Sequence, residues 1–198
     1  MELIIRIAAL VLSIIIHEVA HGYVAYRLGD PTARDANRLT LNPLAHIDLM
    51  GSILLPLFLI LAKSPVLLGW AKPVPFNPGY FRDAKKGIML VGLAGPASNL
   101  ILAAVAALII RIFPFDNIIG HFLIQICIIN VILAVFNMIP IPPLDGSRVV
   151  IGFLPSQMVS GYLRLERYGF LIIFGLLYLG VLGYILIPIA TLLLKFLL

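Results

Sequence analysis

The chain has 198 residues, of which 62% are hydrophobic and only 12% are charged, and its mean hydropathy is +1.10. Because soluble domains are about half apolar and a quarter charged, this composition excludes an ordinary soluble domain and indicates an integral membrane protein. The net charge of +5 does not indicate nucleic-acid binding, since the lysines and arginines lie in loops between apolar segments, where membrane topology explains them.

Four apolar stretches are long enough to cross a membrane as helices, which takes about 20 residues; they cover residues 3–26, 87–112, 118–139 and 168–195. A fifth stretch, residues 51–70, is interrupted by two prolines and a lysine. Residues 37–43 and the proline-studded residues 72–78 are predicted to be extended. The predicted fold is therefore an all-α polytopic membrane protein with about four full transmembrane helices, a broken or re-entrant hydrophobic segment and short cytoplasmic-side β-strands. We expect one membrane-embedded domain over residues 1–198, since no linker or repeat divides the chain.

The path of residues 51–78 decides the topology. If residues 51–70 simply cross the membrane, the loops at 27–49 and 140–167 face opposite sides. If residues 51–78 enter and return, these loops share one side and bring together ten of the fourteen basic residues: Arg27, Arg34, Arg38, Lys72, Arg82, Lys85, Lys86, Arg148, Arg164 and Arg167. The positive-inside rule favours the second path and makes that side cytoplasmic. A re-entrant path also predicts a wet cavity, because irregular backbone at membrane depth must be satisfied by protein or water.

The first apolar stretch carries a motif, HEVAH, at residues 17–21. His17 and His21 are four residues apart, so on a helix both imidazoles project from one face and can meet one metal ion. Glu18 lies beside them, where it can take a proton from a metal-bound water, and the pattern is that of HExxH zinc metalloproteases. The alternative is a set of buried, hydrogen-bonded polar residues, which is disfavoured inside lipid because ionisable residues there are costly.

A catalytic zinc ion needs a third protein ligand. Asp145 lies in the segment FNMIPIPPLDGSRVV (136–150), directly after an apolar span, where three prolines prevent a regular helix. Delivering a carboxylate to a metal is one reason for such a broken segment. The alternative is an ordinary interfacial turn.

Three motifs together resemble those of the site-2 protease family of intramembrane zinc metalloproteases (peptidase family M50): HEVAHG (17–22), AGPASN (94–99) and NMIPIPPLDG (137–146). Two further segments, LTLNPLAHIDLMGS (39–52) and GWAKPVPFNP (69–78), resemble its compact prokaryotic branch, which lacks PDZ and CBS domains. The resemblance implies one Zn²⁺ per chain, held by His17, His21 and Asp145, with Glu18 as the catalytic acid and base. It further implies that Asn137 helps to bind the scissile peptide or its oxyanion and that Asn99 lies close to the site, where it is a candidate substrate-binding residue.

The function that the resemblance implies is hydrolysis of peptide bonds in or near transmembrane segments of membrane proteins. The expected location is the cell membrane, with several spans and the active site toward the cytoplasm; the partners are the lipid bilayer and transmembrane substrates, not nucleic acid. An unwound substrate could pair with the extended edge at 37–43 or 72–78 by strand addition, which makes Pro73, Val74, Pro75 and Phe76 candidate substrate-binding residues. The alternatives are a non-proteolytic membrane zinc-binding or transport protein and an inactive scaffold homologue.

Overall fold

The computed structural model describes residues 1–61, 71–113 and 117–198, and in these residues the regular structure is entirely helical. Three helices are long and apolar enough to cross a membrane: α1 (Glu2–Arg27), α4 (Ala84–Ile112) and α5 (Ile118–Asn137). A fourth crossing is formed if α8 (Glu166–Tyr178) and α9 (Val181–Leu197) count as one broken span. The predicted all-α membrane class is confirmed.

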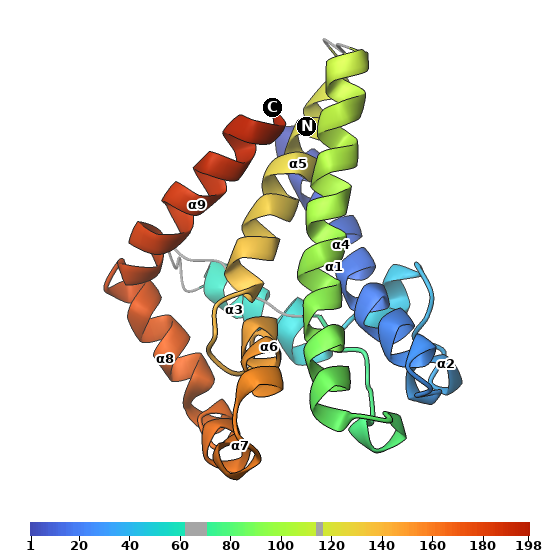
Figure 1. The fold of residues 1–198 in the computed structure, drawn as a ribbon. Helices are drawn as coiled ribbons and strands as arrows, with labels where there is room; N and C mark the ends of the chain where they lie inside the picture. The colour runs from blue at the N-terminus through green and yellow to red at the C-terminus, as the bar shows by residue number, and fades with distance from the viewer. Residues whose placement is uncertain (62–70, 114–116) are drawn as a thin grey trace.

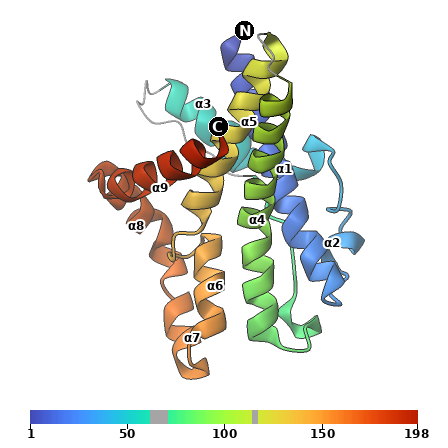
Figure 2. The ribbon, with the colours of Figure 1, turned by 45° about the horizontal axis from the view of Figure 1, so that its top comes forward.

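The three long helices lie side by side at the centre of the molecule (Figures 1 and 2). Helix α4 packs against α1, α5 and the short α6 (Asp145–Phe153), while the α8–α9 pair stands to one side and contacts α5 through α9. The span predicted over residues 168–195 is broken, because α8 and α9 meet at a bend of 78°. The cause is Gly180, whose φ of +73° is left-handed and ends a helix.

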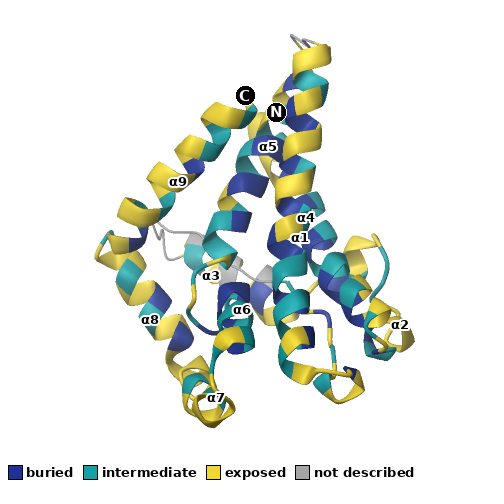
Figure 3. Ribbon diagram, in the orientation of Figure 1, coloured by how far each residue is buried: buried dark blue, intermediate teal, exposed yellow. Residues whose placement is uncertain are grey.

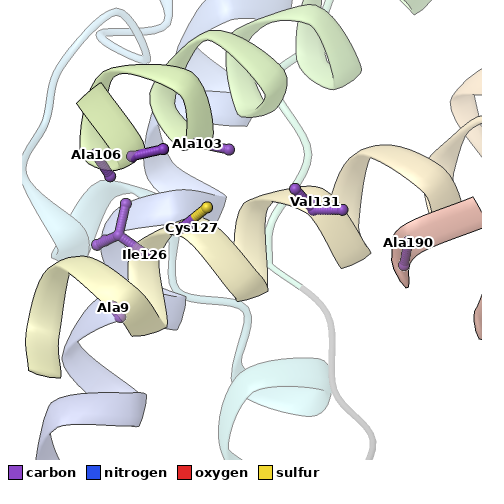
Figure 4. Close-up of a cluster of buried hydrophobic side chains, with 8 residues drawn as sticks. Ala9, Ala103, Ala106, Ile126, Cys127, Val131 and Ala190 are labelled. Atoms are coloured by element: carbon purple, nitrogen blue, oxygen red, sulfur yellow. The ribbon is translucent and has the colours of Figure 1, made fainter. Parts of the chain in front are cut away.

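Small side chains let the long helices approach closely. One buried cluster lies between α1, α4, α5 and α9 (Figure 4) and consists of Ala9, Ala103, Ala106, Ala107, Ile126, Cys127, Val131 and Ala190. Alanines of this kind are typical of helix interfaces in membranes, where close van der Waals packing stabilises association. Large apolar residues are exposed on the outer faces of the helices, above all on α8 and α9 (Figure 3), as a lipid-facing surface requires.

The prediction of short β-strands is wrong for the described residues, since residues 37–43 are not a strand and residues 72–77, although extended as predicted, pair with no neighbouring strand. In the first segment, Asn37 has a left-handed φ of +54° and Asn42 caps the 3-10 helix η1 (Pro43–His46). The second segment is extended, but its N–H groups donate to a loop and to side chains instead of a neighbouring strand. Pro73 and Pro75 carry no N–H, so this segment cannot form a regular ladder. Residues 72–77 are called the strap below.

The interrupted apolar segment forms the π-helix η2 (Leu49–Leu54) and α3 (Leu55–Leu61), and the remainder of the predicted re-entrant path, residues 62–70, lies outside the described residues. The N–H of Lys72 donates to the carbonyl of His46 at 2.9 Å, so the chain before and after this segment meets at one place. That contact is expected of a segment that enters and returns. The remaining short helices are α2 (Thr32–Asp35), η3 (Pro78–Tyr80) and α7 (Ser156–Leu163).

Candidate metal centre

His17 and His21 of α1 meet Asp145, the first residue of α6, in a buried cluster. The Oδ2 atom of Asp145 lies 3.0 Å from Nε2 of His17 and 3.1 Å from Nε2 of His21, and the two Nε2 atoms are 3.1 Å apart. The three residues are 4–7% exposed. The structure therefore brings together the three metal ligands that the sequence suggested.

Glycines of α4 make room for this cluster. A Cβ atom at Gly95 would lie 2.5 Å from Cε1 of His17 and 2.5 Å from Nε2 of His21, so only glycine lets both imidazoles lie against α4. A Cβ atom at Gly92 would lie 3.0 Å from the carbonyl of Asp145, so α6 also packs directly on this helix. The first turn of α6 lies against the end of α5, since a Cβ atom at Gly146 would lie 2.3 Å from the carbonyl of Met138.

Each of the three residues has a partner on the side away from the cluster. Nδ1 of His21 lies 2.6 Å from the carbonyl oxygen of Val91, which can only accept, so Nδ1 carries a proton and, in the neutral imidazole, Nε2 is bare. Nδ1 of His17 lies 2.6 Å from Oδ1 of Asn99. Arg148 donates to Oδ1 of Asp145 at 2.9 Å, whereas Oδ2 has no hydrogen-bond partner among the described residues.

The charge on Asp145 is set by competing effects. Burial alone would raise the pKa of this carboxyl, whereas the Arg148 guanidinium, which donates to Oδ1, lowers the pKa by stabilising the carboxylate. Asp145 is therefore a carboxylate at neutral pH. Its Oδ2 and the imidazole nitrogens present lone pairs to one another, an arrangement that a cation satisfies.

The donor set fits zinc. Ligand atoms about 2.0–2.1 Å from a tetrahedral zinc ion lie about 3.3 Å apart, close to the separations of 3.0–3.1 Å in this cluster. Two imidazoles and one carboxylate leave the fourth position open, as in catalytic sites, whereas structural zinc sites have four protein ligands.

Glu18 is held by the strap. Its Oε2 accepts the N–H of Val74 at 2.9 Å, and the Val74 side chain is buried against α1, where a Cβ atom at Gly22 would lie 2.7 Å from Val74 Cγ1. The far end of the strap is fixed by the fully buried Asp30, whose Oδ2 accepts the N–H of Asn77 at 2.6 Å. The strap therefore passes directly over the glutamate of the HExxH motif.

The other predicted site residues lie outside the His/His/Asp cluster. Asn137 ends α5, is half-buried and donates to the carbonyl of Leu133 at 3.0 Å. Asn99 is fully buried behind His17 and contacts Asn130, so it presents no surface to a substrate in this structure. Phe76 lies beneath the Arg148 guanidinium, 5.2 Å from ring centroid to Cζ.

Sequence reasoning missed two supporting residues. From the sequence, Arg148 is counted only among the basic residues that indicate membrane topology. Its position three residues after Asp145 on a helix allows the ion pair that the structure shows. Asn130 lies in the middle of an apolar span, where a polar residue is itself a signal of function.

Comparison with known proteins identifies the family. The model of peptidase family M50 matches residues 114–179. The chain is 37% identical over 192 residues to YwhC of Bacillus subtilis, named as a candidate zinc metalloprotease, and the match covers 92% of this chain and 84% of YwhC. It is 30% identical over 176 residues to Rip2 of Mycolicibacterium smegmatis, similarly named, covering 88% of this chain and 66% of Rip2. For the zinc metalloprotease MJ0392 of Methanocaldococcus jannaschii the identity is 24%, covering 87% and 43% of the two chains. No solved structure matches the chain.

A buried His/His/Asp cluster on a membrane-spanning helix, with a glutamate beside it, defines the class: a zinc-dependent peptidase within the membrane. The chain belongs to peptidase family M50. It is an intramembrane zinc metalloprotease, as the resemblance of its three motifs implied.

Proposed function

We propose that this metalloprotease cleaves peptide bonds in or near transmembrane segments of membrane proteins, using one zinc ion held by His17, His21 and Asp145. The observation that carries the proposal is the triangle of three lone-pair atoms, 3.0–3.1 Å apart and buried at the end of a helix that can span the membrane. When bound, zinc supplies hydroxide at neutral pH and polarises the substrate carbonyl.

Glu18 is proposed as the acid and base. Its carboxylate accepts a proton from the attacking water and passes that proton to the leaving amine, a role worth about 10²–10⁴-fold in rate. The N–H of Val74 holds one carboxylate oxygen and leaves Oε1 for the water, so the strap orients the base. Asn137 is proposed to donate to the substrate carbonyl. Its amide has two N–H groups, and only one is needed for the bond to Leu133.

The strap is proposed to guide the substrate. Pro73 and Pro75 are exposed, Val74 is buried and Phe76 is half-buried, so the strap turns its proline face outward. Because prolines have no N–H, an added substrate strand can pair there only with carbonyl oxygens. A substrate must be unwound to do so, since an intact helix keeps its peptide groups in its own hydrogen bonds.

The membrane orientation is proposed from the distribution of charge. The end of the molecule with α2, the strap, α6 and α7 (Figure 1) carries the ten basic residues of the predicted cytoplasmic loops, whereas Arg6, Arg111 and Lys195 lie toward the opposite end. By the positive-inside rule this distribution supports a cytoplasmic position for the first end. We place the protein in the cell membrane, with the metal centre opening toward the cytoplasm. All of residues 1–198 are proposed to form one membrane-embedded domain.

The test compares Glu18→Gln with the matched control Glu166→Gln, an exposed glutamate at the start of α8. Purified protein in detergent is assayed for bound zinc and for cleavage of transmembrane peptides. We expect Glu18→Gln to keep its zinc and to lose cleavage by at least about 10²-fold, and Glu166→Gln to match the wild type. Equal cleavage by wild type and Glu18→Gln would contradict the mechanism, and zinc binding that survives His21→Ala would contradict the ligand set.

A further inference from the structure

A chain of buried side-chain hydrogen bonds runs behind His17. Oδ1 of Asn99 lies 2.6 Å from Nδ1 of His17, and Nδ2 of Asn99 donates to Oδ1 of Asn130 at 2.6 Å. Nδ2 of Asn130 donates to Oγ of Ser13 at 2.7 Å, and the Ser13 hydroxyl donates to the carbonyl of Ala9 at 2.7 Å. Ser13, Asn99 and Asn130 are 0% exposed. The chain therefore links α1, α4 and α5 in a region that neither lipid nor bulk water reaches.

The direction of every bond in this chain is fixed from its far end. The single hydroxyl proton of Ser13 goes to the carbonyl of Ala9, so the Ser13 oxygen must accept from Asn130. Asn130 Nδ2 also donates to the carbonyl of Ile126 at 2.8 Å, which uses both of its protons. The Asn130 oxygen can then only accept from Asn99.

The direction of these bonds also determines which nitrogen of His17 carries a proton. Because Nδ2 of Asn99 donates to Asn130, the oxygen of Asn99 faces His17 and can only accept. Nδ1 of His17 must therefore carry a proton, and in the neutral imidazole this leaves Nε2 with a lone pair directed at Asp145 and His21. Backbone carbonyls of α1 and α5, which cannot change roles, thus decide the tautomer of a histidine about one helical turn beyond Ser13.

We propose that Asn99, Asn130 and Ser13 are positioning residues that fix His17 as the Nδ1–H tautomer and aim its Nε2 at the metal. This inference rests on the proposed ligand set. Partners behind a metal-binding histidine fix its ring orientation and raise its basicity, and their loss costs about 10–100-fold in metal affinity. In this proposal Asn99 supports His17 and does not contact the substrate.

The alternative role for these residues is packing between helices, and two substitutions at one position separate the two roles. Asn99→Leu removes the acceptor that faces His17. Asn99→Asp keeps an oxygen acceptor there, and a carboxyl group behind a zinc-binding histidine is a common arrangement. The second carboxyl oxygen can hold a proton and donate it to Oδ1 of Asn130, as the Asn99 amide does, so the Asn130 amide keeps the direction that Ser13 and Ile126 fix. If the chain acts on His17, Asn99→Asp restores what Asn99→Leu loses.

The experiment measures the Zn²⁺ dissociation constant of full-length protein in detergent by competition with a chromophoric chelator, without substrate. We expect Asn99→Leu and Asn130→Leu to raise this constant about 10–100-fold, with Asn99→Asp within a few-fold of wild type. The control is Gln125→Leu, which removes an amide from a half-buried position of α5 outside the chain. The visible spectrum of the Co²⁺-loaded protein should shift for the two leucine variants and not for the control.

Two results would overturn the inference: wild-type zinc affinity in Asn99→Leu or Asn130→Leu, or an Asn99→Asp protein that binds zinc as weakly as Asn99→Leu. Failure of the proposed ligand set is separable from either result, because in that case His21→Ala would retain zinc. Failure of the proposed proteolysis would show only in the cleavage assay.

Discussion

Gly95 of α4 offers a sharp test of how the metal centre is packed. In Gly95→Ala, the added methyl group would lie 2.5 Å from Cε1 of His17 and 2.5 Å from Nε2 of His21. Ordinary contacts between such atoms are about 3.5–4.0 Å, so each imidazole must move by roughly 1 Å. A displacement of this size in a catalytic site costs on the order of 10²-fold in rate, and we expect zinc affinity to fall together with cleavage.

The matched control is Gly175→Ala in α8, where an added Cβ atom has no neighbour within 4 Å. Both substitutions favour helix formation by about 1 kcal/mol, so a defect confined to Gly95→Ala comes from the imidazoles. Zinc affinity is measured by chelator competition, and activity by cleavage of a transmembrane peptide. A Gly95→Ala protein with wild-type zinc affinity and wild-type cleavage would refute the packing on which the centre depends.

Three further predictions concern the strap, its anchor and the metal. Gly22→Ala places a methyl group 2.7 Å from Cγ1 of Val74 and so displaces the strap that holds Glu18. We expect cleavage to slow about tenfold, which is less than the loss of the whole general base would cost, and zinc content to stay at the wild-type value. Asp30→Ala leaves the N–H at the end of the strap without its acceptor and should lower the free energy of unfolding by about 1–3 kcal/mol; an equal loss in exposed Asp35→Ala, measured by thermal unfolding in detergent, would contradict this. Adding zinc to metal-free protein, at 100 times the zinc dissociation constant of the wild type, should raise the free energy of unfolding by about 2.7 kcal/mol. The same gain in His17→Ala would show that the ion binds elsewhere.

Hydropathy and helical spacing are enough to predict the parts of the fold that depend on single helices. The central helices follow from apolar runs of about 20 residues, and the approach of two imidazoles follows from a spacing of four. The bend between α8 and α9 does not follow, because hydropathy is averaged over a window and is blind to the left-handed φ of Gly180. The extended backbone of the strap follows from its prolines, but the same prolines lack the N–H groups that a β-strand needs, so the strap does not pair as a strand.

The candidate ligands could be found from the sequence, but their partners could not. Asp145 stands out because a lone carboxylate follows a broken apolar segment. Arg148 lies three residues after Asp145, and this spacing permits their ion pair within α6 without requiring it. Asn130 is visible as a polar residue in an apolar span, but its contact with Asn99, 2.6 Å away across the interface of α4 and α5, depends on side-chain directions in three dimensions that the sequence does not specify.

Helix α4 supplies none of the three candidate ligands and still serves all of them. Its Val91 carbonyl bonds His21 and its Asn99 amide bonds His17, while Gly92 and Gly95 admit α6 and the two imidazoles. These four positions lie within nine residues, which cover about 12 Å of helix at a rise of 1.5 Å per residue, along the face that α1 and α6 cover. The AGPASN motif therefore fits a rigid support, because a buried metal centre requires its imidazoles to be both accommodated and oriented before the ion binds.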